Sequence, residues 1–83
     1  MALVDVGLVR LKRVWAASLR VQLAAAERQD DAAVAFDGIG DPGLAARARA
    51  RAAACRDRYA VLVARHPEWL EDVSETRVGE HRR

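Results

Sequence analysis

Apolar residues recur along this chain at alternating steps of three and four residues, once in each half. This spacing places side chains along one face of an α-helix and is typical of helices that pack lengthwise against one another. Each half is therefore predicted to form one helix with a buried stripe. The first stripe consists of Leu8, Leu11, Trp15, Ser18, Gln22, Ala25, Gln29, Ala32 and Phe36. The second consists of Ala45, Ala48, Ala52, Cys55, Tyr59, Leu62, His66, Trp69 and Val73.

Glycine and proline separate the two predicted helices. The first helix is expected to begin between Ala2 and Asp5 and to end near Phe36, because a glycine- and proline-rich segment, DGIGDPG, follows it. Within that segment, Asp41 followed by Pro42 is typical of an N-cap and a first helical position. Since the connection is short, the two helices are predicted to be antiparallel neighbours.

The second helix is predicted to end near Arg65, where Pro67 either breaks it or begins a short third helix that runs to about Val73. The fold class is therefore all-α, an antiparallel two-helix hairpin with a short C-terminal third helix. Residues 1–73 are expected to form the hairpin domain and residues 74–83 a charged C-terminal tail.

An antiparallel register centred on the turn brings together residues whose numbers add to about 80. It places Trp15 beside His66 and Gln22 beside Tyr59, so that buried polar atoms could find hydrogen-bond partners. Agreement between apolar stripe, polar pairing and charge favours this register. The expected charge pairs are Asp30 and Asp31 with Arg49 and Arg51, and Lys12 and Arg13 with Glu68.

A chain of 83 residues has room for one small core, which usually needs a disulfide, a metal or a partner chain for stability. Cys55 is the one cysteine, and two histidines supply no metal-ligand cluster, so association into a helical bundle is predicted instead. No apolar run is long enough to cross a bilayer, and the start of the chain lacks a basic leader. We therefore expect a cytoplasmic protein without a membrane partner. The dominance of Arg over Lys and the many alanines favour a bacterial or phage origin.

Two motifs of known chemistry are matched only superficially. Gly38-x-Gly40-x-x-Gly43 has the spacing of a dinucleotide-binding loop, but a helix precedes it where that loop needs a strand, and Pro42 removes an amide. The aspartates around the turn lack the alternating ligand spacing of a calcium loop. A flexible turn with solvated carboxylates is the simpler interpretation, and neither a cofactor nor a metal is expected.

No catalytic group is evident around the reactive residue types. Cys55 lies among small residues of the core stripe, which is typical of a buried, inert thiol. His66 precedes Pro67 and is interpreted as a junction residue. No serine, aspartate or second histidine is placed to complete a catalytic group with either side chain, so the protein is not expected to be an enzyme.

A second stripe of mainly small residues follows the second helix on the side opposite the first stripe. A lone hairpin would leave this face in water, and its small side chains would let another helix approach closely. Alanine also favours helices on solvent-exposed faces, so the pattern alone does not separate the two explanations. The predicted protein interface consists of Ala46, Ala50, Ala54, Val61 and Ala64.

Arginines flank the second helix on both sides of its core stripe. Such a row could follow a phosphate backbone. The net charge is only +2, however, and the acidic end of the first helix is expected to neutralise part of the row. Any binding to nucleic acid should therefore be weak and salt-sensitive. The candidate nucleic-acid residues are Arg47, Arg51, Arg58 and Arg65.

These observations together favour a small, non-enzymatic helical interaction protein. It is predicted to self-associate or to dock on a larger protein partner, as a subunit, an adaptor or a bacterial or phage accessory factor. The alternative is a small basic nucleic-acid-associated regulator that uses the arginines of the second helix.

Overall fold

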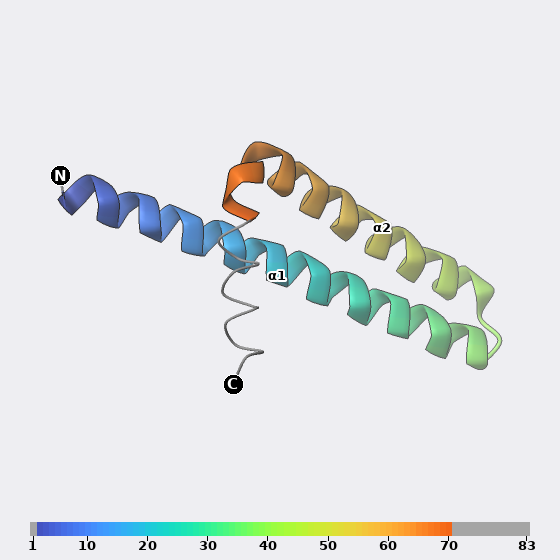
Figure 1. The fold of residues 1–83 in the computed structure, drawn as a ribbon. Helices are drawn as coiled ribbons and strands as arrows, with labels where there is room; N and C mark the ends of the chain where they lie inside the picture. The colour runs from blue at the N-terminus through green and yellow to red at the C-terminus, as the bar shows by residue number, and fades with distance from the viewer. Residues whose placement is uncertain (1, 71–83) are drawn as a thin grey trace, which may run out of the picture.

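The computed structural model describes residues 2–70, with side chains from Val6 onward, and consists of helices in this range. Helix α1 (Ala2–Gly38) runs antiparallel to α2 (Pro42–Arg65), and a short 3₁₀ turn, η1 (Pro67–Trp69), follows α2 (Figure 1). The predicted all-α hairpin is thus confirmed.

The turn between the helices lies in the glycine-rich segment where the sequence predicts it. Gly40 has a φ of +79°, a left-handed conformation that glycine adopts without strain. Around it, the amide of Asp41 donates to the carbonyl of Phe36 (2.9 Å) and the amide of Gly40 donates to that of Asp37 (3.1 Å). This pair of hydrogen bonds is a Schellman motif, which satisfies the last carbonyls of α1.

The start of α2 is capped as the sequence predicts. Oδ1 of Asp41 accepts a hydrogen bond from the amide of Leu44 (3.0 Å), and Pro42 occupies the first turn, where its missing amide costs nothing. The turn and the cap together fix where the antiparallel pair begins.

The seam between the helices is made almost entirely of small side chains. On α1 the buried stripe is shifted by one residue from the predicted one: Leu19 is buried, whereas Ser18 is only half-buried. Burying Leu19 removes a large apolar group from water and leaves a hydroxyl accessible, so this rotation is the favourable one. Ala26 and Ala33 replace Ala25 and Ala32 in the same way. The buried residues are Trp15, Leu19, Ala26, Ala33, Ala45, Ala48, Ala52 and Cys55.

Two alanine clusters set the register of the hairpin. Near its middle, Ala26 packs against Ala52 and Cys55. Nearer the turn, Ala33 packs against a second pair of alanines, Ala45 and Ala48. These contacts join residues at the predicted separation from the turn, so the predicted register is confirmed for the seam.

Trp15 closes the other end of the seam. Its Nε1 donates a hydrogen bond (2.7 Å) to the carbonyl of Leu62, which lies in the last turn of α2. Carbonyls there have no amide partner within the helix, so Trp15 acts as a cap supplied by the opposite helix. The indole also meets the rings of His66 and Trp69 edge-on, at centroid distances of 6.3 and 5.7 Å. The predicted pairing of Trp15 with His66 is confirmed.

The predicted third helix is replaced by the single 3₁₀ turn. Pro67 and Trp69 bound this turn, and the ring of Trp69 stacks on His66 at 3.6 Å between centroids. This stacking and the contact with Trp15 hold the turn against α1. The remainder of the predicted helix, to Val73, and the predicted tail, 74–83, lie outside the described residues.

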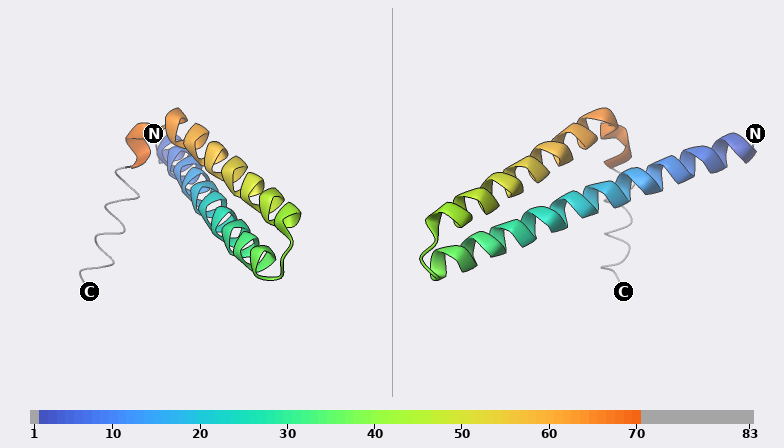
Figure 2. Two further views of the ribbon diagram at one scale, coloured as in Figure 1. Left: turned by 90° about the vertical axis from the view of Figure 1, so that its right-hand side faces the viewer. Right: turned by 180° about the vertical axis from the view of Figure 1, so that it is seen from behind.

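The first helix is much longer than the second, 37 residues against 24. Its N-terminal part projects beyond the end of α2 in both Figure 1 and Figure 2. We call this part, residues 2–14, the α1 overhang; at 1.5 Å per residue it is about 20 Å long. Leu8 and Leu11, predicted to be buried, lie here and are 44% and 61% exposed, because α2 has ended before it reaches them.

Candidate functional site

One edge of the hairpin, which we call the aspartate edge, is closed by two ion pairs. Asp37 of α1 pairs with Arg49 of α2, and Asp30 pairs with Arg56. The hydrogen bond to Asp30 and the charge of that carboxylate raise the pKa of Arg56 above its ordinary value. All four side chains remain substantially exposed, so each pair contributes modestly to stability.

The aspartates pair with different arginines from those predicted. We expected Asp30 to meet Arg49 or Arg51, but Arg56, one to two turns further along α2, reaches it instead. Helical side chains lean toward the N-terminus of their own helix, and in an antiparallel pair these leans run in opposite directions. A long arginine therefore meets a carboxylate that is not level with its own Cα.

The opposite edge, which we call the arginine edge, carries Arg47, Arg51, Arg58 and Arg65 on α2. All four are exposed. Of these, Arg47, Arg51 and Arg65 form no ion pair or hydrogen bond with any residue from 6 to 70. The acidic residues of α1 thus neutralise the aspartate edge and leave this edge positive.

Arg58 is held in place without being neutralised. Its Nε donates a hydrogen bond to Oε1 of Gln22 (3.1 Å), and its Nη2 lies 3.3 Å from Sγ of Cys55. Both partners are neutral groups. We had placed Gln22 beside Tyr59; its side-chain oxygen instead bonds the neighbouring Arg58.

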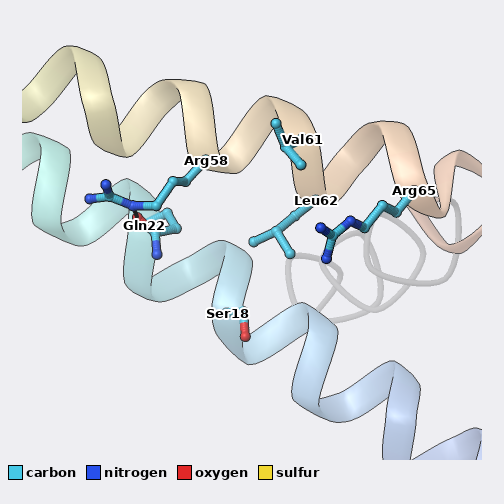
Figure 3. Close-up of a pocket in the computed structure, with 6 residues that line it drawn as sticks. All are labelled: Ser18, Gln22, Arg58, Val61, Leu62 and Arg65. Atoms are coloured by element: carbon cyan, nitrogen blue, oxygen red, sulfur yellow. Dashed lines mark hydrogen bonds between the residues drawn. The ribbon is translucent and has the colours of Figure 1, made fainter.

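A shallow open groove of about 360 Å³ lies on the arginine edge, between the two helices (Figure 3). Arg58 reaches across its floor toward Gln22, and Leu62 points toward α1. We call it the arginine groove. Its lining residues are Ser18, Gln22, Arg58, Val61, Leu62 and Arg65. The lining combines two arginines with two apolar side chains, an amide and a hydroxyl, a combination suited to an amphipathic anionic ligand.

The predicted interface on the outer side of α2 is accessible in this structure. Ala46, Ala50 and Ala64 are exposed, and Ala54 is half-buried. Val61, at 52% exposed, also lines the arginine groove. The stripe and the arginine groove therefore meet at Val61.

Cys55 and His66 take part in packing and helix capping. Cys55 is buried in the alanine seam. His66 caps the end of α2, stacks on Trp69 and has Nδ1 3.4 Å from Oε1 of Glu68. The ammonium of Lys12 lies 5.8 Å from the centroid of the ring of Trp69, the residue after Glu68, and the expected pairing of Glu68 with Lys12 and Arg13 stays a prediction.

Within residues 6–70, no three histidine, cysteine or carboxylate side chains gather closely enough to hold a metal ion. Among the described helices, none combines the length and the apolar character required to span a membrane.

Three features were missed from the sequence: the pairing of Asp37, the groove position of Ser18 and the exposure of Leu11. The position of Ser18 follows from the rotation of α1 that buries Leu19, and the exposure of Leu11 follows from the early end of α2 relative to α1. The pairing of Asp37 with Arg49 follows from the opposite leans of the two side chains. A strict count of seven from Leu19 to Ala26 and Ala33 would have placed Ser18 on the edge.

Comparison of the chain with protein-family models, with curated proteins and with solved structures gave no significant match.

Proposed function

We propose that this protein is a small, non-enzymatic interaction subunit that associates with a second copy of itself through the α1 overhang. The observation that carries the proposal is the exposure of Leu8 and Leu11 on the face of α1 that, further along, packs against α2. Val14 adds a third exposed apolar group to the same helix segment. A partner helix on the overhang would continue the seam that α2 leaves unfinished.

The size of the existing core supports association. Trp15 and Leu19 are the only large apolar side chains that the hairpin buries among residues 6–70; the remaining buried positions are alanines and Cys55. Buried apolar area stabilises by about 25 cal/mol per Å², and alanine supplies little of it. Burying Leu8, Leu11 and Val14 between two copies would add to the core where it is thinnest.

A second copy is a suitable partner for geometric reasons. Two overhangs related by a twofold axis perpendicular to the helices run antiparallel, and each can then present its leucines to those of the other. Arg10 and Arg13 lie at other positions around the helix and can keep their charges in water.

Sedimentation equilibrium of the Leu11→Arg variant tests this proposal. Leu11 lies outside the intramolecular seam, so the variant should keep its helical circular dichroism while the dimer dissociates. Val34→Arg is the matched control, because Val34 is 70% exposed on the same helix but lies near the turn. We expect a wild-type dimer, a monomeric Leu11→Arg variant and an unchanged Val34→Arg variant. A wild-type chain that stays monomeric at high concentration would overturn the proposal.

The outer stripe of α2 remains the second candidate surface for association. Val61→Arg distinguishes it from the overhang, because it places a charge among Ala50, Ala54 and Ala64 without touching Leu8 or Leu11. Loss of the dimer in Val61→Arg with retention in Leu11→Arg would move the interface to α2.

The alternative function, binding of nucleic acid, is favoured by one observation, the unneutralised charge of the arginine edge. Such a complex would rest on phosphate contacts and weaken steeply with salt. Against it, Leu62 and Val61 line the groove beside Arg58 and Arg65, and no aromatic ring among residues 6–70 lines it for base stacking. Binding of a labelled oligonucleotide that persists at physiological salt would favour this alternative.

A further inference from the structure

The arginine groove lies on a row of arginines with a regular repeat. Arg51, Arg58 and Arg65 are spaced by seven residues, which is two helical turns or about 10.5 Å. In packed helices this position flanks the seam and sets the choice of partner through charge pairing. The row is therefore placed where a third helix would meet it.

The α1 side of this edge gives the row no carboxylate. Ser18 lines the groove, and the positions seven and fourteen residues further along are Ala25 and Ala32. On the aspartate edge the corresponding positions of α1 are Asp30 and Asp37, which are paired. Small side chains opposite the arginines leave both space and uncompensated charge.

The lining of the groove defines the chemistry of its occupant. Arg58 is oriented by Gln22 and has no carboxylate partner within residues 6–70, and Arg65 lies two turns away. Between them the surface is apolar, from Leu62 and Val61. A matching helix carries carboxylates seven residues apart, with an apolar residue three or four positions after the first of them.

A second copy of the hairpin does not offer this pattern. Among residues 6–70, Asp30 and Asp37 are ion-paired, Asp41 caps α2 and Glu68 lies against His66. In the full sequence the other carboxylates seven residues apart are Glu68 and Glu75, and the positions three and four after Glu68 are the acidic Glu71 and Asp72, where the pattern requires an apolar residue. The complementary helix therefore belongs to a different protein.

We propose that the arginine groove binds an acidic amphipathic helix of another protein, whose carboxylates pair with Arg58 and Arg65 and whose apolar residue packs on Leu62. The helix lies along the hairpin and turns the two-helix arrangement into a three-helix one. This interaction uses a different surface from the α1 overhang and does not depend on self-association.

The test uses fluorescence anisotropy with labelled synthetic helical peptides and the full-length protein. One peptide carries glutamate at one position of every heptad and leucine four residues after it. A control peptide of the same composition has its glutamates moved to the face opposite the leucines. We expect the first peptide to bind at least about tenfold more tightly than the control.

Charge reversals locate the contact. Arg58→Glu or Arg65→Glu should weaken binding of the acidic peptide by about tenfold, whereas Arg20→Glu, the same change on an exposed part of α1, should alter it by less than about twofold. A lysine version of the peptide should bind the doubly reversed variant, Arg58→Glu with Arg65→Glu. Circular dichroism checks that each variant stays helical.

Two results would overturn the proposal. The first is equal binding of both peptides, or binding that is insensitive to reversal of Arg58 and Arg65. The second is a single-stranded or duplex oligonucleotide that binds more tightly than the acidic peptide at physiological salt and is lost in the same variants. Repeating the titration with Leu11→Arg separates this outcome from a failure of self-association.

Discussion

The arginines of α2 meet aspartates on one edge of the hairpin and small neutral side chains on the other. Arg49 and Arg56 are paired within the chain, whereas Arg58 has only neutral partners and Arg65 has none among residues 6–70. The two rows are similar in sequence and exposure, so the opposing residues of α1 make the difference. An arginine row therefore indicates a binding surface only after its partners across the seam are known.

Removal of Trp15 should have the largest effect, because both edges rest on the seam that it closes. Trp15→Ala deletes a buried ring and the hydrogen bond to Leu62, and should lower the free energy of unfolding by about 3 kcal/mol or more. Urea denaturation followed by circular dichroism measures this change.

Trp15→Phe is the matched control, since it keeps an aromatic ring in place while it loses the hydrogen bond, at about 1 kcal/mol, and the second ring of the indole. An effect of Trp15→Ala no larger than that of Trp69→Ala, whose ring is only half-buried, would show that the seam does not depend on Trp15.

Ser18→Glu should make the arginine edge resemble the aspartate edge. The new carboxylate faces Arg65 across the groove and should stabilise the hairpin by about 0.5 kcal/mol relative to Ser18→Gln, which has the same shape without the charge. The same variant should weaken binding of the acidic peptide. Equal stability of the two variants at low salt would mean that a carboxylate at position 18 does not pair with an arginine as Asp30 and Asp37 do.

The sequence was sufficient to predict the two long helices and their register, whereas the predicted third helix is a single 3₁₀ turn. The ends of α1 and α2 at the turn and at Arg65 lie within two residues of the predicted ones. Gly40, Asp41 and Pro67 allowed this prediction because they act through local backbone geometry. Trp15 was correctly placed beside His66, since an antiparallel pair with a short turn has little freedom to slide.

Which side chains face the seam was predicted less well. Steps of three and four residues fit a stripe through Ser18 as well as one through Leu19. Which of the two is buried depends on the surface of α1 that α2 covers, and this is a property of the assembled pair of helices. Arg56 was not assigned to Asp30, because the lean of long side chains shifts ion pairs along the helix. The exposure of Leu11 depends on where α2 ends and not on its own periodicity.

The most direct test of the difference between the edges is a pair of identical substitutions two residues apart on α2. Arg56→Glu replaces an ion pair with repulsion from Asp30, whereas Arg58→Glu removes a charge that has no carboxylate partner within residues 6–70. Urea denaturation of the two variants at low salt compares them at constant net charge. We expect Arg56→Glu to lower the midpoint clearly and Arg58→Glu to leave it near that of the wild type. Equal loss of stability in both variants, or a greater loss in Arg58→Glu, would contradict the assignment of one edge to folding and the other to binding.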